Sequence, residues 1–192
     1  MRIKELLLEY LKRDYKKIIL WILGLGLFAG GFVPAFIEIA KDSGLEGIKA
    51  TLENPAMIAL VGNTPDTEYT VGAMYSHTML LFSAVFAMII SIMHIIKHTR
   101  KEEESGLTEQ ILSFKLNKLS PSISLLLENI IINITLGIFI TLIMVITGDA
   151  SITIRGSILF ALSISLVGIF GGSIAHFFAQ IMPSSSNTTI SS

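Results

Sequence analysis

Four long apolar stretches, separated by polar segments, dominate the pattern of this chain. They cover residues 18–37, 74–96, 123–147 and 156–182, to within a few positions. Each contains enough residues for a helix that crosses the roughly 30 Å hydrocarbon core of a bilayer. Because hydrocarbon offers the backbone no hydrogen-bond partners, such stretches fold as helices. The sequence therefore predicts an all-α, polytopic membrane helix bundle with four transmembrane helices, in a transmembrane domain over 18–182.

The segment before the first stretch, residues 1–17, is amphipathic. Apolar side chains recur there at helical spacing, and six basic residues flank them. This pattern suits the headgroup zone of an anionic leaflet, so we expect an N-terminal interfacial helix; the alternative is a polar extension of the first span. The tail at 183–192 is polar and uncharged, and we expect it to be disordered.

The connection over 38–73 is long and contains one recognisable element. Asn54 and Pro55 precede a short apolar run that Gly62 closes. Asn is a favoured N-cap, Pro suits the first helical position, and Gly commonly ends a helix. A short helix is therefore predicted within this connection.

Two of the spans carry glycine pairs at four-residue spacing, Gly26 with Gly30 and Gly168 with Gly172. Such pairs let a second helix approach closely, so we interpret them as helix-packing positions. The alternative is the general abundance of glycine in membrane helices. Asn133, in the third span, is expected to hydrogen-bond a neighbouring helix, whereas Glu128 is placed near the inner end of that span.

The distribution of Lys and Arg predicts the orientation. The N-terminal segment has six such residues and 97–122 has five, against two in 38–73 and one in the turn near Arg155. Positively charged loops stay in the cytoplasm. We therefore expect a multi-pass protein of the cell (plasma) membrane with both termini cytoplasmic.

The composition and the motifs limit the partners and activities that this chain can have. Only 15% of residues are charged and the net charge is −1, so nucleic acid is not an expected partner. The chain has no cysteine, which excludes disulfides, thiolate metal sites and cysteine nucleophiles. It has no Walker A pattern, so it is not expected to be an enzyme that hydrolyses ATP. His94, His98 and Glu102 share one helix face, but the lack of a third strong ligand and the basic neighbours argue against a metal site, and none is predicted.

Charge collects at residues 97–121, between the second and third spans. This segment holds five basic and four acidic residues. The second span is expected to continue as a helix to Glu104, with a bend at Gly106. Residues 108–117 are expected to form a second, amphipathic helix, and the chain is expected to return to the membrane at Pro121. We predict a short knob that projects from the bilayer.

This segment resembles the first cytoplasmic loop of ABC-2-type permeases, the membrane subunits of ATP-driven exporters. The similarity lies in Lys97-His98-Thr99-Arg100, the triple acid, Gly106 and Glu109, and it extends to ENPAMIALVG and to LVGIFGGSIAHFFAQ in the fourth span. The resemblance implies that the loop is a cytoplasmic coupling helix, which seats in a groove of the ATPase subunit. The partner-binding residues would be Glu102, Glu103, Glu104, Gly106, Glu109, Ile111, Leu112 and Phe114.

The resemblance further implies a permease subunit of an ABC-type exporter that moves a lipophilic or amphipathic compound, such as an antibiotic, out of the cell. ATP and Mg would bind the partner ABC ATPase, with no cofactor in this chain, and a second permease chain or copy would complete the transporter. Four spans correspond to the N-terminal portion of such a permease, to a split gene product or to a four-span subunit. The alternative function is a non-transporting membrane protein, for example an immunity, sensor or scaffold subunit.

Overall fold

The four predicted spans form a bundle of long helices in the structure, a computed structural model that describes residues 3–41, 43–64, 68–104, 120–147 and 149–181, with the backbone alone for 100–104. Within these ranges every regular element is a helix. Four of the helices are long and apolar enough to cross a membrane, which confirms the predicted fold class. The helices are α1 (Ile3–Gly30), α2 (Val33–Ala40), α3 (Gly44–Leu52), α4 (Pro55–Val61), α5 (Val71–Glu104), α7 (Ser120–Thr147) and α8 (Ile154–Ile181).

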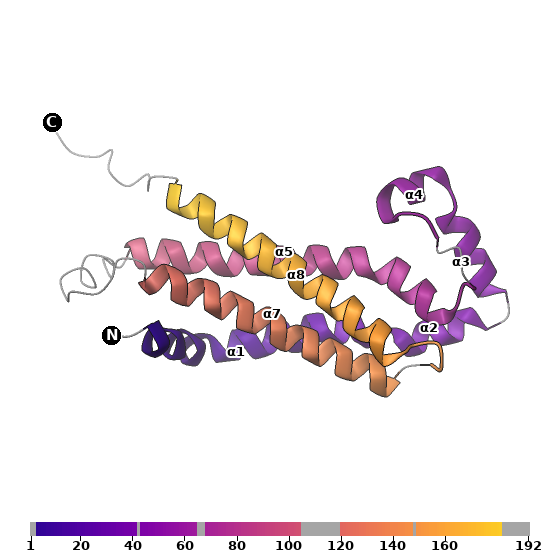
Figure 1. The fold of residues 1–192 in the computed structure, drawn as a ribbon, viewed down its shortest axis with the longest axis horizontal. Coiled ribbons are helices and arrows are strands. Elements are labelled where there is room, and N and C mark those ends of the chain that lie inside the picture. The colour runs from indigo at the N-terminus through magenta and orange to yellow at the C-terminus, as the bar shows by residue number, and fades with distance from the viewer. Residues whose placement is uncertain (1–2, 42, 65–67, 105–119, 148, 182–192) are drawn as a thin grey trace.

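The long helices run up and down through the bundle (Figure 1). α8 packs on α5 and on α7, and α1 packs on α7. α1 begins, α5 ends and α7 begins at one end of the bundle, called here the loop end. α2, α3 and α4 lie at the opposite end, called here the α3 end.

The first span differs from its predicted form at both boundaries. Residues 3–30 are one helix with no break at residue 17, so the N-terminal segment continues the first span, as in the alternative stated above. The helix stops at Gly30, and α2 restarts at Val33 with Pro34 in its first turn. A Cβ atom at Gly31 would collide with the carbonyl oxygen of Leu27, so the turn between the two helices requires glycine there.

The short helix predicted in the 38–73 connection is confirmed as α4. The Asn54 side chain accepts a hydrogen bond from the Ala56 amide at 3.0 Å, and Pro55 is the first helical residue. Gly62 ends the helix with φ of 87°, a value that favours glycine. α3, which precedes it, was not predicted.

α5 continues as a helix to Glu104, as predicted. Residues 105–119 lie outside the described residues, and so do Gly106, Glu109, Ile111, Leu112 and Phe114 of the predicted coupling helix. The side chains of 102–104 are likewise not described. The partner-binding assignment therefore stays a prediction.

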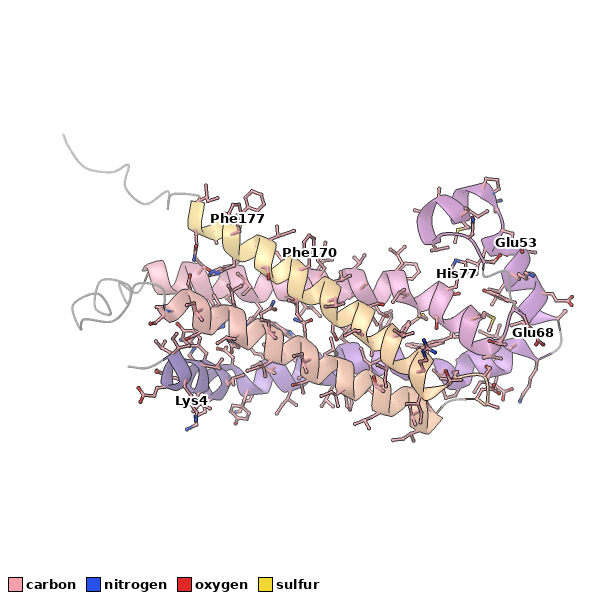
Figure 2. All side chains as sticks on the ribbon, in the orientation of Figure 1. Lys4, Glu53, Glu68, His77, Phe170 and Phe177 are labelled. Carbon is pink, nitrogen blue, oxygen red and sulfur yellow. The ribbon has the colours of Figure 1, made fainter. Side chains whose placement is uncertain are left out.

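Large apolar side chains cover the outer surface of the bundle between its two ends. Phe170 and Phe177 of α8 point away from the other helices, whereas Lys4 and Glu68 lie at opposite ends (Figure 2). A surface of this kind is stable against lipid and not against water. The helices are thus arranged as a membrane-embedded bundle, with its charged side chains towards the ends.

Candidate functional site

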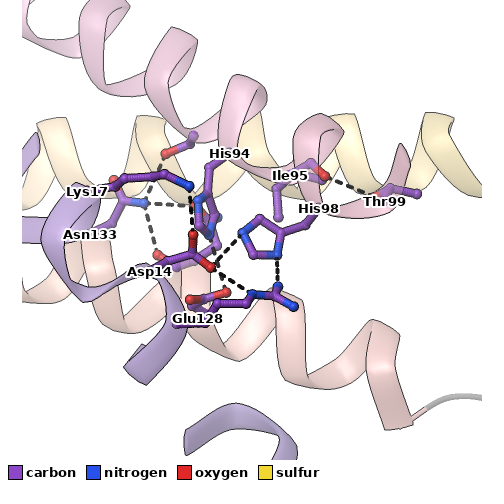
Figure 3. A network of polar contacts seen from close by, with 11 residues as sticks. Asp14, Lys17, His94, Ile95, His98, Thr99, Glu128 and Asn133 are labelled. Atoms are coloured by element: carbon purple, nitrogen blue, oxygen red, sulfur yellow. Dashed lines mark hydrogen bonds and ion pairs between the residues drawn. The ribbon is translucent and has the colours of Figure 1, made fainter. Parts of the chain in front are cut away.

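Four ionisable side chains are buried together between three helices, towards the loop end (Figure 3). We call them the ionisable cluster: Asp14 of α1, His94 and His98 of α5, and Glu128 of α7. None of the four is more than 6% exposed. Because burying an ionisable group inside a membrane bundle is costly, such groups commonly mark a functional site.

Helix geometry brings the cluster together. His94 and His98 are four residues apart on α5, so they lie one turn apart on the same face, and their ring centroids are 4.5 Å apart. Glu128 reaches this face from the first half of α7, and Asp14 reaches it from α1. Trp21 of α1 packs edge-on against His94, with centroids 5.4 Å apart.

The contacts of His98 are saturated. Its Nδ1 lies 2.8 Å from Arg13 Nη2, and its Nε2 lies 3.3 Å from Asp14 Oδ2. Arginine can only donate, so Nδ1 accepts and Nε2 carries the proton that faces Asp14. Asp14 also accepts hydrogen bonds from Lys17 Nζ at 3.1 Å and from Arg13 Nε at 3.2 Å. This half of the cluster is a closed network of charged and polar groups.

The other half, His94 and Glu128, is not saturated. His94 Nε2 lies 3.3 Å from Glu128 Oε2, an ion-pair distance. The two groups are not aligned for a hydrogen bond, however, and His94 Nε2 and both Glu128 carboxylate oxygens have no hydrogen-bond partner among the described residues. Because Glu128 is 0% exposed, water at the protein surface does not reach it. Buried polar atoms of this kind normally have a partner, so this pair is the chemically unsatisfied part of the bundle.

An amide network lies next to the cluster, deeper in α7. Asn133 Nδ2 donates to Ser91 Oγ of α5 at 3.0 Å, which confirms the predicted hydrogen bond to a neighbouring helix. Ser165 of α8 donates to the Asn133 carbonyl oxygen at 2.8 Å. These bonds connect α5, α7 and α8 across the middle of the bundle.

The glycine pairs lie at close contacts between helices. A Cβ atom at Gly168 would overlap the Asn133 side chain, and one at Gly172 would overlap Asn129. On α1, a Cβ atom at Gly26 would overlap Phe139, and Gly30 lies against Ile143 of α7.

The sequence interpretation missed how this site is assembled. It paired His94 and His98 with Glu102 of the same helix, whereas the structure pairs them with Glu128 of α7. It placed Glu128 near the inner end of its span, as the structure does, but it did not predict that the side chain is completely buried between helices. One signal was present: Glu128 is the only acidic residue within the last three predicted spans, and such a residue is expected to have a buried partner.

Comparison with known proteins gives one informative similarity. The chain is 28% identical over 182 residues to the multidrug efflux system permease protein Rv1217c of Mycobacterium tuberculosis. The match covers 93% of this chain, so it includes most of each long helix, and 32% of the relative. The chain thus spans about a third of the length of the curated relative that it matches. No family model and no solved structure matches the chain.

These findings support a multi-pass membrane protein similar to a transporter permease. The four apolar helices account for the membrane assignment. The similarity, which runs through all four of them, favours a transport component over an enzyme.

Proposed function

We propose that this chain is a permease subunit, or the N-terminal four-span part of one, of an ATP-driven ABC-2-type exporter. The observation that carries the proposal is the similarity to a multidrug efflux permease along nearly the whole chain. The loop resemblance over 97–109 supplies the ABC-2 assignment. The cargo would be a lipophilic or amphipathic compound, in keeping with the relative's name.

The course of α5 supports a mechanical role for the segment that follows it. α5 has 34 residues and is therefore about 51 Å long, more than a bilayer core requires. The same helix contacts α8 along its length, holds His94 and His98, and ends where residues 105–119 begin. A displacement of that segment by an ATPase would therefore act directly on the helix that organises the bundle core.

The test is co-purification with an ATP-binding-cassette ATPase encoded beside this chain. We expect a stable complex whose formation falls at least about tenfold with Glu109→Lys or Gly106→Pro, since a charge reversal or an altered bend disrupts a docking helix. Glu46→Lys is the matched control, because it reverses an exposed charge on α3 at the opposite end of the bundle.

Circular dichroism of each variant verifies that the spans remain helical. Equal ATPase binding by all three variants would contradict the coupling-helix assignment. The absence of any ATPase complex, together with an unchanged export phenotype on deletion, would instead support the non-transporting alternative.

A further inference from the structure

We propose that His94, His98 and Glu128 form a binding site for a divalent transition-metal ion of the zinc type, which joins α5 to α7. Ligand atoms of these three residues all lie within 4.8 Å of one another, and all three residues are buried. The proposal concerns these side chains alone and does not depend on the transport assignment.

The distance between the ligand atoms of His94 and Glu128 already suits coordination, whereas His98 would have to move closer. Zinc binds imidazole nitrogen and carboxylate oxygen at about 2.0–2.2 Å, so two ligands of a tetrahedral site lie roughly 3.4 Å apart. His94 Nε2 and Glu128 Oε2 are 3.3 Å apart. An ion beside these two atoms would be near the imidazole of His98, whose ring centroid is 4.5 Å from that of His94.

The unsatisfied atoms are a second and independent observation. His94 Nε2, Glu128 Oε1 and Glu128 Oε2 are buried, and within the described part of the chain no group hydrogen-bonds to them. His94 is 4% exposed and Glu128 is 0% exposed. A cation that accepts electron pairs from these atoms would satisfy them at once, which a purely structural pair in this geometry does not do.

His98 would enter the coordination shell by exchange. Both of its ring nitrogens are engaged in the structure, one by Arg13 and one by Asp14. Coordination replaces one of these contacts by the metal. Asp14 stays in place through Lys17 and Arg13, so its carboxylate remains beside His98 as a positioning group.

The ligand set favours zinc among the common ions. Two imidazoles four residues apart on one helix, together with a carboxylate from another element, form a set that zinc accepts, with one position left open. Calcium and magnesium prefer sites built from oxygen ligands. The site is therefore expected to select zinc or its spectroscopic substitute cobalt.

The experiment uses the full chain, purified from membranes and treated with a chelator, and titrated with Co²⁺. We expect the visible absorption of four- or five-coordinate cobalt, a stoichiometry of one ion per chain, and displacement by Zn²⁺. His94→Gln and Glu128→Gln should each weaken binding by at least about 100-fold, and Asp14→Asn by about tenfold, as for a group that orients a ligand. His77→Gln, on the same helix but next to Gly62 at the α3 end, should leave binding unchanged.

His94→Cys is the variant that identifies the ligand. The chain contains no cysteine, so a thiolate-to-cobalt charge-transfer band in this variant would come from position 94 alone. Circular dichroism and size-exclusion chromatography show which variants fold. If Glu128→Gln does not fold, His94→Cys and His98→Gln are used to test the site in its place. The proposal is overturned if folded wild-type protein gives no cobalt spectrum, or if His94→Gln binds Co²⁺ as tightly as the wild type does.

Discussion

The two halves of the bundle are built from the same four helices but differ in what they bury. Towards the α3 end, α1, α5, α7 and α8 pack through an apolar core around Tyr75, Met79, Ile140 and Phe160. The hydroxyl of Tyr75 donates to the Ala29 carbonyl oxygen at 2.8 Å and is thus satisfied. Towards the loop end, the ionisable cluster is buried beside a smaller apolar cluster that includes Ile95 and Leu125, and the amide network lies between the two ends.

The difference suggests that the two halves have different roles, one in stability and one in binding. In the bilayer, the hydrophobic effect adds little to helix association, so close packing provides most of it, and the larger apolar core lies in the apolar half. At the α3 end, in the turn between α7 and α8, the Ser151 amide donates to Asp149 Oδ1 at 2.8 Å and thereby lowers the pKa of that carboxyl. The polar half is distinguished by the buried ionisable cluster, in which His94 Nε2 and both Glu128 carboxylate oxygens have no hydrogen-bond partner among the described residues, and this is the reason to propose a binding function there.

The largest expected effect comes from the apolar half. Tyr75 is fully buried, and its ring packs against Phe36 and Phe160 at centroid distances of 5.0 and 5.8 Å. Tyr75→Ala leaves a cavity and should lower the free energy of unfolding by about 3 kcal/mol, the low end for an aromatic truncation because lipid and not water is the surrounding solvent. The measurement is SDS-induced unfolding followed by circular dichroism.

Tyr75→Phe is the matched control, since it keeps the ring and removes only the hydrogen bond to Ala29. A loss of about 1 kcal/mol is expected. If the two variants lose the same stability, the ring packing is not what holds this half together.

A smaller effect is expected where the two halves meet. Gly168→Ala places a methyl group against Asn133, which its bonds to Ser91 and Asn129 hold in place. The overlap should lower the free energy of unfolding by about 2 kcal/mol. Gly24→Ala is the matched control, because no described atom lies within 4 Å of a Cβ there, and it should leave stability unchanged or slightly raised. If both variants have the same free energy of unfolding in the SDS titration, the helices are not in close contact at Gly168.

Much of the fold follows from local properties of the sequence. Hydrophobic length alone predicts the four spanning helices, and the Asn54-Pro55 and Gly62 signals predict α4. The sequence does not predict that α1 is continuous, because the amphipathic pattern over 1–17 fits both a surface helix and an extension of the span. In the structure, Leu6 and Tyr10 are buried in one cluster with Ile95 and Leu125. This packing between distant parts of the chain is not visible in the local pattern.

The site was less accessible to sequence reasoning. The i, i+4 spacing of His94 and His98 is visible in the sequence, but the third residue of the proposed site comes from α7, thirty residues or more away along the chain. Which face of α7 meets α5 depends on how the helices rotate against each other. An apolar pattern on nearly every side of α7 leaves that rotation undetermined, so the pairing with Glu128 emerges only in three dimensions.

The smallest expected change in stability, and the sharpest test of the contrast between the halves, is the double substitution His94→Leu with Glu128→Leu. Replacing a buried ionisable pair by apolar side chains is commonly neutral or stabilising, so in the presence of a chelator the free energy of unfolding should be unchanged or raised by about 1 kcal/mol. The single variant His94→Leu should be less stable than the double one, because it leaves the Glu128 carboxylate buried beside an apolar side chain. If the double variant instead unfolds as readily as Tyr75→Ala, the pair contributes to stability as the apolar core does, and the assignment of stability to one half and binding to the other fails.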